Sequence, residues 1–292
     1  MAIASSALEI PPAHNRWLKY YRTAGLPTMW CPGCGIGIVV QSMVRAIDKL
    51  GLDQDKVVIV TGIGCSGAIY NYLDFDAYHG THGRALPAAT GIKLADPSLH
   101  VIVPMGDGDC LGIGGNHFIH ACRRNVDVTA IILNNQNYGQ TGGQGSPTTP
   151  TDAIASTSPY GHLEQAFDPC DLAIAAGATY VARGTAYHAT QLTDLITNGI
   201  QHRGFSVIEA RSPCPVQFGH RNELGSAVDM LRSQKEQAIN VRAAEGKTPE
   251  ELKDRIVMGE LRRIEAPETE YTYRYDRLIE RAQTRAKPRS RR

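Results

Sequence analysis

Residues 100–139, HVIVPMGDGDCLGIGGNHFIHACRRNVDVTAIILNNQNYG, decide the fold class of this chain. The segments His100–Met105 and Val128–Leu133 are short apolar runs rich in Val and Ile, which is typical of strands buried on both faces of a sheet. Between them, Gly115–Arg124 has a helical pattern. A strand, a helix and a second strand in this order predict two parallel strands joined by a crossover helix.

The same alternation continues on both sides of this stretch. Further strands are predicted at Val57–Thr61, Ala178–Ala182 and Phe205–Ala210, and further helices at Ile36–Leu50, Ala85–Ala95, Pro169–Ala176 and Thr190–His202. The sequence therefore predicts an α/β fold in which helices cover both faces of a parallel sheet. In such sheets ligands bind beyond the carboxyl ends of the strands, which is where the glycine-rich segments of this chain fall.

The 292 residues divide into one large domain and two smaller segments. We expect the sheet domain to span residues 30–220, after an N-terminal segment at residues 1–29. Residues 221–292 contain many charges and few glycines, so we expect a helical extension without a core of its own. Within this extension, Thr248-Pro249-Glu250-Glu251 has the pattern of a capping box and predicts the start of a helix.

Composition narrows the class of partner and the compartment. A net charge of +1 gives no reason to expect nucleic acid or a membrane surface as a partner. No stretch approaches the roughly 18 apolar residues of a membrane helix, and the first residues lack the basic start and apolar centre of a signal peptide. We therefore expect a cytoplasmic protein whose seven cysteines are metal ligands or packed thiols rather than disulfides. The basic run Arg281–Arg292 is interpreted as a solvated end.

Two polar segments follow the strands of the opening stretch. The first strand ends in Met105-Gly106-Asp107-Gly108-Asp109, and the second ends in Asn134-Asn135-Gln136-Asn137-Tyr138-Gly139. Magnesium prefers oxygen ligands and takes one or two from the protein when phosphates supply others. Asp107 offers a carboxylate, Asn135 a side-chain carbonyl and Asn137 a backbone carbonyl. Neither segment alone is specific, but together they predict a magnesium–diphosphate site and are similar to the GDG…NN motif that binds thiamine diphosphate.

A glycine-rich loop upstream has two possible interpretations. Gly62-Ile63-Gly64-Cys65-Ser66-Gly67 formally matches the dinucleotide fingerprint G-x-G-x-x-G. That fingerprint needs an acidic residue at the end of a second strand about 20 positions later, where this chain has His82-Gly83-Arg84. NAD is therefore disfavoured, and we expect the loop to contact the diphosphate cofactor. His82 is a candidate diphosphate contact, and an ordinary polar loop residue is the alternative.

Four cysteines lie in segments that suit a metal site. Cys31-Pro32-Gly33-Cys34 places two thiolates beside one ion or cluster, and no predicted strand precedes it, which disfavours a thioredoxin-like redox pair. Cys65 lies in the glycine-rich loop and Cys214 lies in a loop-like segment past a strand. Four thiolates suit either tetrahedral zinc or a [4Fe–4S] cluster. Their spread over three distant segments favours the cluster, although the spacing alone leaves both open.

The remaining three cysteines have a different setting. Cys110, Cys122 and Cys170 lie next to or within helical patterns, so we expect packed thiols. The same reasoning applies to His117 and His120, which lie on a predicted helix and are expected to be packing or surface residues.

Over about Trp30–Phe218 the chain resembles the beta subunits of 2-oxoacid:ferredoxin oxidoreductases. The segments CPGCG, GIGCS, HGRALPAATGIKLA, GDGD, NNQNYGQTGGQ and SPCP occur in the order found in that family. The tail after His220 is more loosely similar to that of beta chains that act on 2-oxoglutarate. The resemblance implies the thiamine-diphosphate-binding fold and an enzyme that acts on 2-oxo acids.

Position by position, the resemblance implies three sets of site residues. Magnesium would be held by Asp107, Asn135 and the carbonyl of Asn137. The [4Fe–4S] cluster would be held by Cys31, Cys34, Cys65 and Cys214. Thiamine diphosphate would contact Ile63, Gly64, Cys65, Ser66, His82, Gly106, Gly108, Asp109, Asn137, Gly139 and Gln140. No catalytic residue is assigned to this chain, because the glutamate that activates the cofactor comes from the alpha subunit in that family.

The activity implied by the resemblance is the coenzyme A-dependent oxidative decarboxylation of 2-oxoglutarate to succinyl-CoA and CO2, with ferredoxin as electron acceptor. It implies an alpha subunit as partner, with αβ pairs assembled into a heterotetramer. Three alternatives remain at this point. They are a pyruvate-specific beta subunit, a thiamine-dependent decarboxylase or dehydrogenase without a cluster, and a zinc-stabilised interaction subunit.

Overall fold

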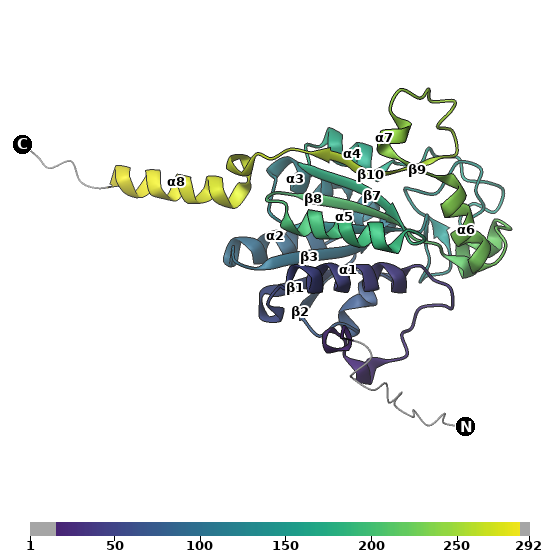
Figure 1. The fold of residues 1–292 in the computed structure, drawn as a ribbon, viewed down its shortest axis with the longest axis horizontal. Coiled ribbons are helices and arrows are strands. Elements are labelled where there is room, and N and C mark those ends of the chain that lie inside the picture. The colour runs from purple at the N-terminus through teal and green to yellow at the C-terminus, as the bar shows by residue number, and fades with distance from the viewer. Residues whose placement is uncertain (1–15, 287–292) are drawn as a thin grey trace, which may run out of the picture.

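The computed structural model describes residues 16–286, so residues 1–15 of the predicted N-terminal segment and residues 287–292 of the basic tail lie outside the described residues. An eight-stranded sheet in the order β2-β1-β3-β4-β8-β7-β10-β9 forms the centre of the molecule (Figure 1). The first six strands in this order pair in parallel. The strands are β1 (Val57–Thr61), β2 (Asp76–His79), β3 (His100–Gly106), β4 (Thr129–Asn134), β7 (Tyr180–Thr185), β8 (Ser206–Arg211), β9 (Ala238–Asn240) and β10 (Ile256–Arg263). A separate short hairpin pairs β5 (Asn137–Tyr138) with β6 (Gln144–Gly145).

Helices cover both faces of the sheet, as predicted (Figure 1). One face carries α1 (Ile36–Leu50) and α5 (Ala189–Gln201), and the other carries α2 (Ala85–Ala95), α3 (Gly115–Arg124) and α4 (Pro169–Ala175). Alternate residues of each strand enter the two cores: in β1, Ile59 packs in the first and Val60 in the second. The α/β fold class is therefore confirmed.

The strands and helices predicted within residues 30–220 are all present, with small differences at their ends. The largest difference is in β7, which we expected to end at Ala182 and which continues to Thr185. One strand of the parallel sheet was missed. All four residues of β2 are exposed, because β2 is the edge strand, so the sequence has no apolar run there to signal a strand.

The region after residue 220 contains helices, as expected, and also two unexpected strands, β9 and β10. The helices are α6 (Ala227–Gln237), α7 (Val241–Ala244) and α8 (Tyr271–Ala286). Between α7 and α8, β10 pairs antiparallel with β7 and extends the central sheet. The expectation of a purely helical extension is corrected here. The register between β10 and β7 shifts between Glu260 and Arg262, and such an irregular strand has no clean alternation of apolar and polar residues.

The predicted helix start at Thr248 is wrong, although its capping bonds form. The backbone nitrogen of Thr248 donates to the Glu251 carboxylate at 2.8 Å, and the nitrogen of Glu251 donates to the Thr248 hydroxyl at 3.3 Å. The chain then makes a turn and enters β10 at Ile256. The capping box therefore stabilises one isolated turn, because pairing with the sheet takes over a few residues later.

The last helix, α8, projects away from the sheet domain (Figure 1). The buried carboxylate of Glu270 starts it by accepting from the backbone nitrogens of Thr272 at 2.7 Å and Tyr273 at 2.9 Å. Within residues 16–286, no helix combines the length and the apolar character needed to cross a membrane.

A buried ion pair joins β7 to β8 at the carboxyl end of the sheet. Arg183 lies opposite Glu209 in the register, and its Nε donates to the Glu209 carboxylate at 2.5 Å. The same guanidinium binds Asp168 at 2.5 Å. Burial alone would raise the pKa of Glu209, but the charges of Arg183 and Arg211 lower it below its ordinary value.

Arg183→Met should lower the free energy of unfolding by about 3–5 kcal/mol, because it leaves the Glu209 carboxylate buried and unpaired. Urea denaturation at neutral pH measures this loss. Folding lowers the pKa of Glu209. The Glu209 carboxylate therefore stabilises the folded protein at any pH above its pKa in the unfolded chain. This stabilisation is lost as the pH falls through its pKa in the folded protein.

The matched control for this measurement is Lys49→Met. It removes a solvent-exposed ion pair between Lys49 on α1 and Asp194 on α5. We expect it to change the free energy of unfolding by less than about 1 kcal/mol. Equal losses in the two variants would contradict the interpretation.

Candidate active site

A cavity of about 240 Å³ opens where the carboxyl ends of β1, β3 and β4 meet. Its lining includes every residue predicted to contact the cofactor or magnesium: Ile63, Gly64, Cys65, Ser66, His82, Gly106, Asp107, Gly108, Asp109, Asn135, Asn137, Gly139 and Gln140. Parallel strands bring these segments together because their carboxyl ends share one edge of the sheet. The sequence did not indicate the four other lining residues, Ile36, Leu133, Tyr138 and Thr141.

Asp107 is a carboxylate with 1% of its surface exposed. Burial raises the pKa of this carboxyl, and hydrogen bonds from the hydroxyls of Ser146 and Thr148 act in the opposite direction. Among the described residues, no Lys, Arg or His side chain forms an ion pair with Asp107. A buried negative charge needs a compensating positive one, so this carboxylate suits a metal cation.

The amide of Asn135 completes a group of three polar atoms. It lies 3.0 Å from Oδ1 of Asp107 and 2.7 Å from the backbone oxygen of Asn137. With its nitrogen turned toward them, the amide donates to both oxygens. With its oxygen turned toward them, three oxygens converge, and such a set of acceptors suits a cation, because acceptors at this spacing repel one another unless a positive group lies between them. The three residues predicted to hold magnesium therefore fit that ion.

Asp109 organises the neighbouring part of the cavity. Its Oδ1 accepts from the backbone nitrogen of Gly83 at 2.6 Å and lies 3.0 Å from Nδ1 of His82. Burial raises the pKa of Asp109, and the contacts with Gly83 and His82 oppose the rise. Its Oδ2 is buried and has no hydrogen-bond partner. A Cβ at Gly62 would collide with this carboxylate, which explains the first glycine of the loop.

Tyr138 closes the cavity beside Asp107. Its ring packs so closely on Gly108 that any side chain there would collide with it, and its hydroxyl donates to the Gly108 carbonyl at 3.4 Å. Burial raises the pKa of Tyr138, and the charges of Asp107 and Asp109 raise it further. The need for glycine in the GDG segment is therefore partly steric and comes from a residue 30 positions later.

A second cavity of about 200 Å³ contains all four cysteines predicted as ligands: Cys31, Cys34, Cys65 and Cys214. All four are free thiols. Burial, with a smaller contribution from the neighbouring cysteines, raises the pKa of Cys34 to about 12 and that of Cys65 to about 11. Four free thiols that line one cavity suit a metal-thiolate site.

The spacing of these sulfurs in the structure differs from that around a single zinc ion. Among the described residues, no three cysteine sulfurs lie within 4.8 Å of one another. Around one zinc ion with Zn–S bonds of about 2.3 Å, tetrahedral geometry would place the sulfurs about 3.8 Å apart. The side chains would therefore have to rotate before all four could bind one zinc ion.

The two cavities share a wall. Cys65, Asn135, Gly139 and Gln140 line both of them. The backbone oxygen of Cys65 accepts from the indole nitrogen of Trp30 at 2.8 Å, which fixes the loop between the cavities. A group bound to the cysteines would therefore be adjacent to a ligand in the first cavity.

The other cysteines and the helical histidines lie outside both cavities. Cys110, Cys122 and Cys170 are completely buried. Cys170 lies beside Asp168 and Glu209, but Arg183 already pairs with both carboxylates, so this group suits no further cation. His117 and His120 lie on α3 and line neither cavity.

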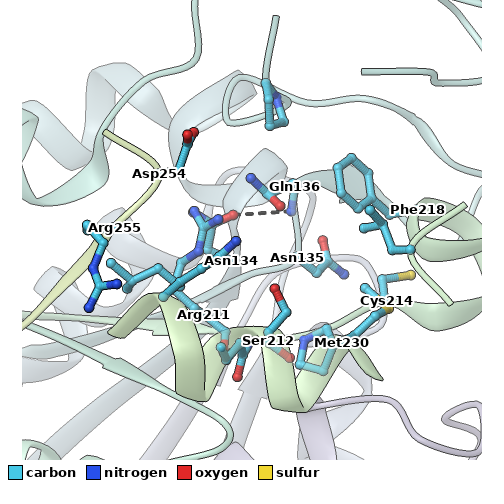
Figure 2. A pocket seen from close by; sticks show the side chains of 17 residues that line it. Asn134, Asn135, Gln136, Arg211, Ser212, Cys214, Phe218, Met230, Asp254 and Arg255 are labelled. Carbon is cyan, nitrogen blue, oxygen red and sulfur yellow. Dashed lines mark hydrogen bonds between the residues drawn. The ribbon is translucent and has the colours of Figure 1, made fainter. Parts of the chain in front are cut away.

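Sequence reasoning missed a larger cavity of about 400 Å³ that adjoins the first at Asn135 (Figure 2). Figure 2 shows Arg211 and Arg255 on one side of it and Cys214 and Phe218 on the other. Arg255 comes from the segment just before β10. No sequence pattern signals this cavity, because it depends on the contact between the region after residue 220 and the sheet.

Comparisons with known proteins agree with this geometry. The family described as thiamine pyrophosphate enzyme, C-terminal TPP binding domain, matches residues 62–210. The chain is 48% identical to 2-oxoglutarate synthase subunit KorB of Methanothermobacter marburgensis over 266 residues, which cover 91% of this chain and 93% of the relative. It is 59% identical to the subunit of the same name from Archaeoglobus fulgidus over 68% of this chain and 74% of that relative.

A solved structure is similar over nearly the whole chain. It is described as 2-oxoglutarate:ferredoxin oxidoreductase from Magnetococcus marinus with 2-oxoglutarate, coenzyme A and succinyl-CoA bound. The similarity has a TM-score of 0.80 and 30% sequence identity, and covers 97% of this chain and 98% of that chain.

Asp107→Ala should weaken the magnesium-dependent binding of thiamine diphosphate at least about 100-fold, equivalent to about 2.8 kcal/mol, because it removes the only charged oxygen of the three-oxygen group. Isothermal titration calorimetry measures the affinity, and circular dichroism checks that the fold is kept. The exposed Asp194→Ala on α5 is the control and should bind normally. Unchanged binding by the Asp107 variant would refute the assignment of the metal site.

Proposed function

The chain belongs to the family of 2-oxoacid:ferredoxin oxidoreductase beta subunits, and from this membership we propose that its two adjoining cavities hold the cofactors of one active site. The resemblance found in the sequence is thereby confirmed. The chain is the beta subunit of an enzyme that acts on 2-oxoglutarate. The observation that carries the proposal is Cys65, which lines both the cavity with Asp107 and the cavity with the other three cysteines.

The first cavity is proposed to hold the diphosphate of the thiamine cofactor with magnesium. Asp107, Asn135 and the backbone oxygen of Asn137 would hold the ion, and their convergence supports this. The glycines on both sides of Asp107 leave its backbone open to phosphate oxygens. When bound, the thiamine group supplies the electron sink that allows a 2-oxo acid to lose CO2.

His82 is proposed as a contact of the diphosphate. Its Nδ1 faces two acceptors, the Asp109 carboxylate at 3.0 Å and the backbone oxygen of Ile63 at 3.3 Å, so Nδ1 carries a proton. This leaves Nε2 as the ring atom that is available to a phosphate oxygen. Asp109 then acts through His82 and through the backbone of Gly83, holding both at the rim of the cavity.

The second cavity is proposed to hold a [4Fe–4S] cluster on Cys31, Cys34, Cys65 and Cys214. The sulfur spacing supports a cluster over zinc, and the shared wall supports a redox role over a purely structural one. When bound, the cluster supplies the acceptance of single electrons. This chain would keep the cluster close to the thiamine group, because Cys65 belongs to a loop that lines both cavities.

The partner subunit is proposed to complete the site. As a beta subunit the chain works with partner subunits. Among the described residues that line the first cavity, the acids are Asp107 and Asp109, and no glutamate is present. This supports an alpha subunit that donates the activating glutamate. Assembly of αβ pairs into a heterotetramer is part of the same proposal and rests on the family resemblance. Ferredoxin is proposed as the electron acceptor and coenzyme A as the acyl acceptor. The seven free cysteines support a reducing, cytoplasmic setting.

Steady-state assays of the co-purified complex test the proposed reaction. In that reaction 2-oxoglutarate loses CO2 and two electrons, and its succinyl group forms a thioester with coenzyme A as a proton is released. With coenzyme A and a viologen dye as acceptor, kcat/KM for 2-oxoglutarate should exceed that for pyruvate at least about tenfold, or about 1.4 kcal/mol of transition-state stabilisation. A preference for pyruvate would contradict the assignment of 2-oxoglutarate as the substrate. Product formation without reduction of the dye would contradict the proposed electron transfer.

Cys34→Ser should lose most of its iron after anaerobic purification, whereas the wild type should contain about four iron atoms per chain. Metal analysis and electron paramagnetic resonance of the reduced protein measure this. Cys122→Ser is the matched control, because Cys122 is a buried thiol outside the cavity, and it should keep its iron. Full iron in the Cys34 variant, or zinc without iron in the wild type, would refute the cluster assignment.

A further inference from the structure

We propose that Ser146 and Thr148 are positioning residues for the metal site: their hydroxyls hold one oxygen of Asp107 and thereby present the other oxygen to magnesium. The inference rests on the magnesium site proposed above and extends it to a segment of the chain that was not identified from the sequence. Neither residue lines the cofactor cavity, so neither can act by touching the cofactor.

The two oxygens of Asp107 have separate partners. Oδ2 accepts from Ser146 Oγ at 2.5 Å and from Thr148 Oγ1 at 2.6 Å. Oδ1 lies 3.0 Å from the amide of Asn135, in the group of three atoms described above. A carboxylate free to rotate could turn either oxygen toward the ion. Two hydroxyls fixed on Oδ2 remove this freedom.

The hydroxyls can do this because they are buried with the carboxylate. Ser146 is 3% exposed and Thr148 is 2% exposed. Hydrogen bonds to a charged oxygen are stronger than those between neutral groups, and at a buried site no solvent competes for the donors. The arrangement therefore orients Asp107 before the ion arrives, which lowers the cost of binding it.

The turn that carries the two hydroxyls is itself attached to the neighbouring strand. Thr149 Oγ1 donates to the backbone oxygen of Gln136 at 2.6 Å, and Thr148 Oγ1 lies 2.9 Å from Oδ1 of Asn134. The same Asn134 oxygen accepts from the backbone nitrogen of Gln136 at 3.1 Å (dashed line in Figure 2). One turn thus holds Asp107 at the end of β3 and Gln136 at the end of β4, and Gln136 in turn bonds Asn134. It fixes the separation of the two side-chain ligands.

This network of buried hydrogen bonds continues to the ion pair between Arg183 and Glu209. Asn134 Nδ2 donates to the Glu209 carboxylate at 2.7 Å, and Glu209 pairs with Arg183. Asn134 is therefore oriented by a charge on the next strand, and its Oδ1 accepts from the backbone nitrogen of Gln136, while Thr148 gives its one hydroxyl proton to Asp107. The positions of Thr148 and Asp107 depend on a network that crosses β3, β4, β8 and β7.

Thr148→Val tests the proposal, because it removes the hydroxyl and keeps the shape of the side chain. The full chain is co-purified with its partner subunit, and magnesium chloride is titrated at a fixed concentration of thiamine diphosphate. Removal of a group that orients a metal ligand typically costs about 10- to 100-fold in metal affinity, so the magnesium concentration for half-maximal cofactor binding should rise by that factor. Thr148→Ser retains the hydroxyl and should bind within about threefold of the wild type.

A buried threonine elsewhere gives the control for a purely structural effect. Thr197 is 4% exposed, and its hydroxyl donates to the backbone of its own helix at 2.8 Å. Thr197→Val should leave the magnesium requirement unchanged, whatever it does to the melting temperature measured without cofactor. If Thr148→Val does not fold, Ser146→Ala serves the same test with the same expected rise.

The outcomes separate this inference from the proposed function. A wild-type magnesium requirement in Thr148→Val or Ser146→Ala, with only a lower melting temperature, would overturn the positioning role and leave the magnesium site standing. Failure of the wild-type complex to bind thiamine diphosphate at any magnesium concentration would instead overturn the proposed function.

Discussion

The buried charge of Asp107 is the constraint on which this edge of the molecule depends. A carboxylate with 1% exposure and no cationic side chain paired with it among the described residues is stable only if other groups compensate its charge. Hydroxyls do so on one side, and a site for a cation lies on the other. The protein thus accepts a local cost in folding free energy at the end of β3, which binding of the proposed ion would offset.

The order of the strands places other parts of the site at the same edge of the sheet as Asp107. Parallel pairing brings the ends of β1, β3, β4 and β8 together, so loops separated by up to about 150 residues in sequence form adjoining walls. The antiparallel β10 then widens the sheet beyond β7, and the chain before it contributes Arg255 to the large cavity beside Asn135. The region after residue 220 is therefore part of the architecture of the site and not an appendage to it.

The sequence was sufficient wherever a residue's role depends on its own strand or loop. The buried strands, the helices with an apolar face and the thirteen residues around the first cavity were predicted because each carries its signal locally. The exposed strand β2, the irregular strand β10 and Tyr138 were missed because their roles come from neighbours distant in sequence. Ser146 and Thr148 belong to this second kind: two hydroxyls in a loop give no pattern until the fold places a carboxylate beside them.

The shared wall between the two cavities also limits how this protein can change. Because Cys65, Asn135, Gly139 and Gln140 each face both cavities, a substitution that reshapes one necessarily disturbs the other. The two halves of the centre are therefore not modules that could be gained, lost or transplanted one at a time. An evolutionary route to a related enzyme without the proposed cluster would have to rebuild, in the same step, the loop that lines the cavity with Asp107.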